Sequence, residues 1–258
     1  MNEQNLTNYY NKFNENKRLL TRHGKLEFIT VTKYIEIYLK KYKHPKIIDI
    51  GAGTGRYAKY LAEKGFDVTA VELVKHNLRI IEEDKRIKAY QGNALDLSRF
   101  KDKSFDIVLL FGPLYHLISD KDKLKALREA KRILKDDGIM FVQYIMNEYC
   151  VITHGFKEKM IINEMINNKL DNNYKITPGR QDLYAPVRIC DINFFNEQVK
   201  LKRIKILSPT GPANYIRKYI NKLTEQEFNI FIDYHLKTCE KYELLGASSH
   251  ILDILIKK

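Results

Sequence analysis

A glycine-rich turn and an acidic residue beyond it are the first residues of this chain whose types and spacing suggest a binding site. The turn reads Asp49-Ile50-Gly51-Ala52-Gly53-Thr54-Gly55, and Glu72 follows Gly55 by 17 residues, at the end of an apolar run. Glycines permit a tight turn and let the backbone approach a ligand closely. A carboxylate at the end of the next strand can accept hydrogen bonds from both hydroxyl groups of a ribose. The pair therefore predicts a site for a ligand that contains adenosine.

The same turn argues against two other classes of nucleotide-binding protein. Dehydrogenases that bind nicotinamide dinucleotides use the spacing G-x-G-x-x-G, whereas this turn reads G-x-G-x-G and continues with Arg56. The lysine-containing phosphate loop of nucleotide hydrolases is absent from this position. Taken alone, the turn leaves the identity of the adenosine ligand open.

Strands and helices alternate around the turn, as they do in an open α/β sheet. We expect strands at 46–50, 67–72, 88–91, 105–111, 139–144, 203–207 and 249–257. We expect helices at 26–39, 56–64, 75–84, 121–134, 157–170, 191–199 (with Asp191 as N-cap) and 224–245. Alternation at this spacing indicates right-handed crossovers and a parallel sheet. Ligands of such sheets bind at the carboxyl ends of the strands, where the turn and Glu72 lie.

Five ordered segments resemble the motifs of the class I, Rossmann-like S-adenosylmethionine-dependent methyltransferases, in particular the small-molecule group of types 11 and 25. The matching segments are 47–56, Glu72, 92–96, 105–117 and 132–139. The resemblance covers about 45–145. It implies an α/β fold with a seven-stranded, mostly parallel sheet, an antiparallel last strand and helical cap insertions. The implied organisation is an N-terminal helical lid at 1–44 and a methyltransferase domain at 45–258, with caps at about 147–190 and 208–245.

The resemblance also implies which residues bind the cofactor S-adenosylmethionine, whose product is S-adenosylhomocysteine. The glycine turn would lie beside the methionine part, Glu72 would hold the ribose, and a residue after the third strand would bind the adenine edge. The implied cofactor-binding residues are Asp49, Gly51, Ala52, Gly53, Gly55, Glu72, Leu73, Asn93, Ala94, Phe111 and Gly112.

Methyl transfer from a sulfonium is an in-line displacement with an excellent leaving group, so the protein must mainly position the reacting atoms. A general base is needed only when the acceptor carries a proton that must leave early. His116 and Tyr115, after the fourth strand, are the candidates for that role, although a histidine there is as often structural. His154, His235 and His250 are weaker candidates. The candidate substrate-binding residues are Tyr10, Arg18, Tyr115, His116, Arg180 and Arg188.

Composition narrows the acceptor only slightly. The 258 residues carry a net charge of +13, but the lysines are spread along the chain and form no long basic run. The Asn/Asp-Pro-Pro-aromatic motif of base amino methylases and the Pro-Cys motif of cytosine methylases are absent. We therefore expect a small-molecule acceptor, and keep an RNA or protein methyltransferase with a basic surface as the second hypothesis.

The polar N-terminus and the absence of a long apolar stretch predict a cytoplasmic protein without a membrane segment. The three separated cysteines predict neither a disulfide framework nor a metal site.

Overall fold

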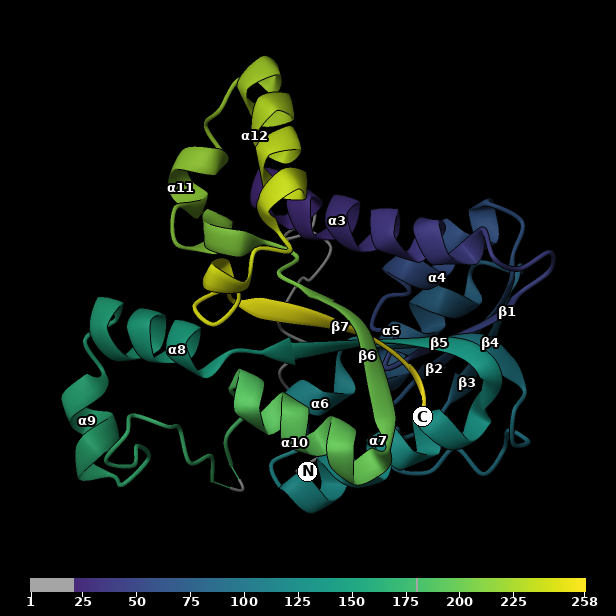
Figure 1. Ribbon diagram of the computed structural model, residues 1–258, viewed down its shortest axis with the longest axis horizontal. Helices are drawn as coiled ribbons and strands as arrows, with labels where there is room; N and C mark the ends of the chain where they lie inside the picture. Colours follow the sequence, from purple (N-terminus) through teal and green to yellow (C-terminus); the bar gives the residue numbers. More distant parts are fainter. Residues whose placement is uncertain (1–20, 180) are drawn as a thin grey trace.

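A seven-stranded sheet forms the centre of the computed structural model, which describes residues 21–179 and 181–258 (Figure 1). The strand order is β3 (Ile87–Gln91), β2 (Asp67–Glu72), β1 (Lys46–Ile50), β4 (Phe105–Leu110), β5 (Leu134–Ile145), β7 (His250–Lys257) and β6 (Leu201–Leu207). Neighbouring strands from β3 to β5 pair in parallel, and β7 runs antiparallel to both β5 and β6. The predicted fold class, including the antiparallel last strand, is confirmed.

Helices cover both faces of the sheet (Figure 1). On one face lie α3 (Arg22–Leu39) and α4 (Arg56–Glu63), whose apolar side chains share a core with the sheet. On the other lie α7 (Asp120–Ile133) and α10 (Ile189–Val199). Every residue of β4 is buried, as its nearly continuous apolar sequence requires of a strand packed on both faces. The strand order reverses between β1 and β4, which places the ligand crevice at their carboxyl ends.

α5 (Lys75–Glu82) joins β2 to β3 and packs against both strands, and the short α6 (Pro113–His116) follows β4. The remaining helices lie in two caps. The first cap, between β5 and α10, contains α8 (Asn147–Cys150), a π-helical segment (Val151–Lys157) and α9 (Ile161–Ile166). The second cap, between β6 and β7, contains a 3-10 turn (Gly211–Asn214), α11 (Arg217–Ile220), α12 (Glu225–Thr238) and another 3-10 turn (Tyr242–Leu244). In Figure 1 the second cap stands beside α3.

Two predicted helices were wrong in extent. The segment 157–170 forms only α9, because the backbone takes positive φ at Lys159 and Asn168 and interrupts the helix on both sides. Its apolar residues gave a helical period, yet Ile162 and Ile166 are exposed and find no core. The predicted helix 224–245 begins as expected, with a capping box between Thr224 and Glu227, but ends at Thr238.

The predicted N-cap of α10 was also wrong. Arg188 occupies that position, and Asp191 lies three residues later, where its carboxylate accepts a hydrogen bond from the Arg188 N–H at 2.8 Å. The Asp191 carboxylate, in the first turn of the helix, therefore supplies the hydrogen-bond acceptor for the backbone N–H of the N-cap residue.

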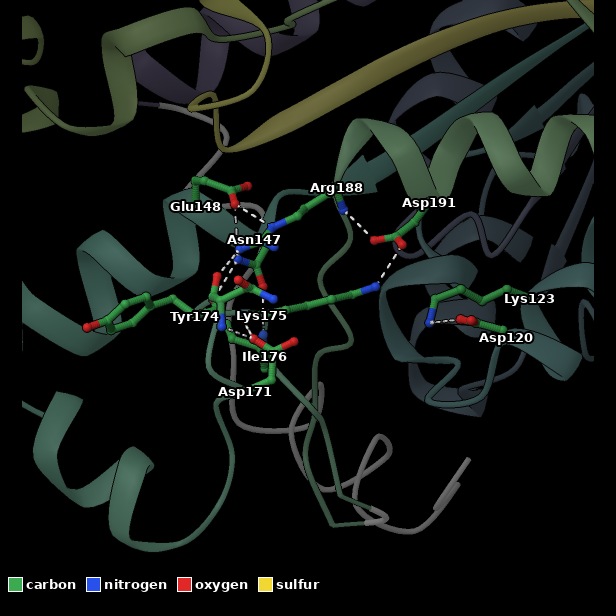
Figure 2. Close-up of polar contacts among 11 residues, drawn as sticks. Asp120, Lys123, Asn147, Glu148, Asp171, Tyr174, Lys175, Ile176, Arg188 and Asp191 are labelled. Atoms are coloured by element: carbon green, nitrogen blue, oxygen red, sulfur yellow. Dashed lines mark hydrogen bonds and ion pairs between the residues drawn. The ribbon is translucent and has the colours of Figure 1, made fainter.

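A polar network fixes the part of the first cap after α9 to α8 and α10 (Figure 2). The Asn147 side chain donates to the Tyr174 carbonyl at 3.0 Å and accepts from the Ile176 N–H at 2.8 Å. The Lys175 ammonium lies 2.7 Å from the Asp191 carboxylate. The irregular chain from α9 to α10 is thus held by side chains in place of regular structure. No helix among the described residues is long and apolar enough to cross a membrane.

The fully buried Asp253 of β7 provides a test of this packing. Its carboxylate accepts two hydrogen bonds from the Arg203 guanidinium, at 2.6 and 2.9 Å, and one from the Asn196 amide at 2.7 Å. Arg203→Met leaves this charge uncompensated, so the free energy of unfolding should fall by about 3 kcal/mol in urea titrations. Lys202→Met, at an exposed position of the same strand, is the control. Equal losses in the two variants would contradict the assignment.

Candidate cofactor and acceptor site

The turn after β1 requires glycine for reasons of geometry. Gly51 has a φ of +71°, and a Cβ there would lie 2.6 Å from the ring of Pro113. Gly53 has a φ of +58°, and a Cβ there would meet no atom within 4 Å, so it would project into open space. The first position needs glycine for close packing, and the second keeps a space clear beside the turn.

Glu72 is buried and hydrogen-bonded to this turn. One carboxylate oxygen accepts from the Gly53 N–H and the other from the Val74 N–H, each at 2.8 Å. Burial raises the pKa of Glu72, and these N–H groups oppose that rise. The end of β2 is therefore fixed against the turn after β1.

Asp49, the last polar residue of β1, is a buried carboxyl group with an unsatisfied oxygen. It is 2% exposed, and its Oδ2 has no hydrogen-bond partner among the described residues. Burial, followed by the charge of Glu72, raises the pKa of Asp49 to about 7, against the opposing effect of the Ala58 N–H. This group is a ready acceptor for a cationic or hydrogen-bond-donating ligand.

A first cavity lies beside the carboxyl ends of β1 and β2. It brings together seven of the predicted cofactor-binding residues: Gly51, Gly53, Glu72, Leu73, Asn93, Ala94 and Gly112. The predicted base His116 also lines this cavity. The His116 Nδ1 lies 2.8 Å from the Leu183 carbonyl, and burial lowers the pKa of its ring. His116 is thus a buried, neutral imidazole on the side of Glu72.

A second, larger cavity adjoins the first, with which it shares Gly51, Gly53 and Gly112. Its walls come from the sheet, from α3 and from both caps. They include the predicted residues Asp49, Ala52, Phe111 and Tyr115, and also His23, Glu27, Arg56, Tyr57, Gln143, Ile145, Tyr149, Tyr184, Asn214, Arg217 and His250. The structure therefore separates the two candidate bases: Tyr115 faces the second cavity and His116 the first.

Other predicted site residues lie elsewhere. Gly55 lines neither cavity, and its N–H closes the turn by donating to the Ala52 carbonyl at 2.9 Å. Arg188 also lines neither cavity; its guanidinium lies 2.6 Å from the Glu148 carboxylate and donates to the Asn173 carbonyl (Figure 2). Tyr10, Arg18 and Arg180 are outside the described residues.

Sequence reasoning missed Gln143 and gave little weight to His250. Gln143 is the first polar residue after the apolar run Ile139-Met140-Phe141-Val142 at the end of β5, and this position is the signal that could have identified it. His23 and Glu27 could not be singled out, because polar residues are ordinary on an amphipathic helix.

Comparisons with known proteins agree with this architecture. Residues 48–142 match the profile of a family described as "Methyltransferase domain". A glycine/sarcosine N-methyltransferase from Aphanothece halophytica is 31% identical over 127 residues, which are 47% of this chain and 48% of that protein. The chain thus spans about half the length of the curated relatives it matches.

Solved structures extend the similarity of fold to almost the whole chain. An S-adenosylmethionine-dependent methyltransferase from Methanosarcina mazei has a TM-score of 0.59 at 17% identity, covering 87% of this chain and 96% of that one. Another from Thermotoga maritima has a TM-score of 0.59 at 18% identity, covering 99% and 98%. The fold is that of the class I, Rossmann-like methyltransferases.

The raised pKa of Asp49 predicts an unusual dependence of stability on pH. Because the pKa is about 7 in the folded protein and 3.8 in an ordinary aspartate, folding loses stability as pH rises from about 4 to 7. Asp49→Asn escapes this loss. The stability of Asp49→Asn relative to the wild type should therefore be about 2–3 kcal/mol greater at pH 8 than at pH 5. The measurement is the free energy of unfolding in urea titrations without added cofactor.

Asp84→Asn is the control for the direction in which stability changes with pH. The Arg86 guanidinium lowers the pKa of Asp84 to about 2, so this substitution should lose stability relative to the wild type as pH rises through about 4. An effect of Asp49→Asn that is the same at every pH would show that Asp49 does not titrate as described.

Proposed function

We propose that this chain, whose residues 48–142 match the profile of a methyltransferase domain, is an S-adenosylmethionine-dependent methyltransferase acting on a small-molecule acceptor. The observation that carries the proposal is the pair of buried carboxyl groups at the ends of β1 and β2. Glu72 lines the first cavity, and Asp49, with its unsatisfied oxygen, lines the adjoining second one. One ligand with a ribose at one end and an amino group at the other would satisfy both.

The residues around the cleft fit this cofactor. Glu72 would accept hydrogen bonds from the ribose hydroxyls, with Leu73 and Asn93 beside the adenine. Asp49 would accept from the amino group of the methionine part, whose positive charge favours the ionised carboxylate. The space left clear at Gly53 lies between these two ends.

The main role of these residues in methyl transfer is to align the reacting atoms. The bound cofactor supplies an activated methyl group with a good leaving group, and the protein must hold a nucleophile in line with it. We assign Gly112, just after β4, to the point at which the two cavities meet, with Phe111 beside it in the second cavity. We assign His116 to the cofactor side, so that Tyr115 is the polar group that reaches the acceptor.

The walls of the second cavity support a small acceptor. They come from three separate parts of the chain: α3, the first cap through Tyr149 and Tyr184, and the second cap through Asn214 and Arg217. Enclosure on several sides is typical of small-molecule sites. One relative is named for glycine and sarcosine, which are small amines. We keep the division into an N-terminal lid at 1–44 and a methyltransferase domain at 45–258 as part of this proposal.

Calorimetry with S-adenosylmethionine tests the cofactor assignment. Glu72→Ala removes the ribose acceptor, so the affinity should fall about 10- to 100-fold, as expected for lost hydrogen bonds to a charged group. Glu82→Ala, on the exposed side of α5, is the matched control and should bind as the wild type does. Unchanged affinity in Glu72→Ala would refute the ribose role. Tight binding of a nicotinamide dinucleotide, with none of S-adenosylmethionine, would refute the cofactor.

Incubation with methyl-labelled cofactor tests the acceptor class. We expect label in a small-molecule fraction of a cell extract, and none there with Glu72→Ala at a limiting cofactor concentration. The RNA and protein fractions are assayed in parallel. Label in either of these two fractions in place of the small-molecule fraction would overturn the proposed class of acceptor while leaving methyl transfer intact.

A further inference from the structure

Gln143 has a buried side-chain amide whose oxygen has a hydrogen-bond partner and whose nitrogen has none among the described residues. It is 2% exposed, and its Oε1 accepts a hydrogen bond from the Tyr115 hydroxyl at 2.7 Å. Its Nε2 is shielded from solvent and has no hydrogen-bond partner among the described residues. Buried polar groups without partners are rare in folded proteins, and each one needs an explanation.

Gln143 is one of the residues that line the second cavity. Gln143 and Ile145 are two residues apart on β5 and therefore point to the same face, where their partners on β7 are Leu252 and His250. In the sheet order, β5 lies two strands from β1, or roughly 10 Å at the usual spacing. Gln143 is thus displaced from Asp49 toward the side of the cavity that the cofactor leaves for the acceptor.

Tyr115 fixes the direction of the amide. Because its hydroxyl occupies the Oε1 of Gln143, the two N–H bonds of the Nε2 are the part left for a ligand. The ring of Tyr115 packs against His250, with centroids 5.4 Å apart, so the hydroxyl is itself held in place.

The charge of the cavity indicates which ligand group would satisfy that donor. Arg217, at the start of α11, lines the same cavity, and its guanidinium makes no hydrogen bond or ion pair with any described residue. Among the residues that the structure describes, the carboxyl groups in the walls are Asp49, which the cofactor would occupy, and Glu27 on α3. An amide N–H and a guanidinium together suit an anionic oxygen, and a carboxylate offers two oxygens to share between them.

We propose that Gln143 and Arg217 bind a carboxylate of the methyl acceptor, with Tyr115 as the residue that positions the Gln143 amide. This inference rests on the proposed function, since it takes the second cavity as the acceptor site. The substrate class is a small carboxylic acid whose nucleophilic atom faces Gly112, two residues after β4, where the two cavities meet.

Binding to the protein saturated with S-adenosylhomocysteine tests the class of ligand. The probes are three acids and their primary amides: glycine and glycinamide, sarcosine and sarcosinamide, and phenylalanine and phenylalaninamide. We expect at least one acid to bind about tenfold or more tightly than its own amide by calorimetry. If no acid binds better than its amide, the inference is overturned. The failure of the proposed function is a separate result, namely no binding of S-adenosylhomocysteine.

Variants test the residues with the best-binding acid. Gln143→Leu and Gln143→Glu preserve the approximate size of the side chain but remove the donors, so acid affinity should fall about tenfold or more. Arg217→Ala should lower the affinity for the acid less, by about three- to tenfold. This decrease in affinity should be smaller at high salt because the Arg217 side chain is exposed. In every variant the affinity for S-adenosylhomocysteine should stay within about twofold of the wild type.

Lys218→Ala and Gln226→Leu, at exposed positions of the second cap outside the cavity, are the matched controls. The positioning role of Tyr115 is tested by a double-mutant cycle. Tyr115→Phe should weaken acid binding in the wild type but cost nothing further in Gln143→Leu. Wild-type acid affinity in both Gln143 variants, or fully additive losses for Tyr115 and Gln143, would overturn these assignments.

Discussion

The hydrogen bonds between the turn after β1 and the end of β2 are the constraint on which the site depends. The N–H groups of Gly51 and Ala52 both donate to the Val71 carbonyl, at 2.8 and 3.1 Å, and the Gly53 N–H donates to Glu72. Parallel strands end at a common edge, but nothing in the sheet itself fixes the loops beyond that edge. Here the backbone of one loop is bonded to the next strand residue by residue. The turn and the carboxylate therefore form one rigid unit, and both cavities are built outward from it.

The sequence predicted the central sheet well because the strands that form it are buried on both faces. The run from Phe105 to Leu110 has no polar face to misplace, so its limits were predicted to within one residue. The extent of a helix was predicted wrongly where its apolar residues do not pack in a core, as in α9, whose residues Ile162 and Ile166 are exposed. The sequence also could not distinguish Tyr115 from His116. These two neighbours lie on the short α6 and line different cavities, and a helix of this length has no sequence period that reveals it.

Asp49 and Gln143 differ from the buried carboxyl group Asp253 in how their polar atoms are satisfied. Asp253, elsewhere in the sheet, is hydrogen-bonded on both oxygens by Arg203 and Asn196. Asp49 and Gln143 are equally buried, yet each keeps one atom without a hydrogen-bond partner among the described residues, and both residues line the second cavity. Tyr144 and Asn196 keep such an atom outside that cavity. An unsatisfied buried group destabilises the fold. Local departures of this kind are expected at functional sites, where a ligand supplies the missing partner.

The helix α3 and the second cap behave as one wall of the acceptor cavity. The Arg22 guanidinium donates to the Asn221 carbonyl, and the His23 N–H donates to the Asn221 side chain. Leu26 packs in a small separate core with Ala213, Ile220 and Phe228. This core lies apart from the two that hold the sheet, although α3 also packs on the sheet through residues such as Val31 and Ile35. The cofactor half of the site is therefore fixed by the sheet, and so is Gln143 on β5. The part of the acceptor half that the second cap forms can vary while the sheet stays the same.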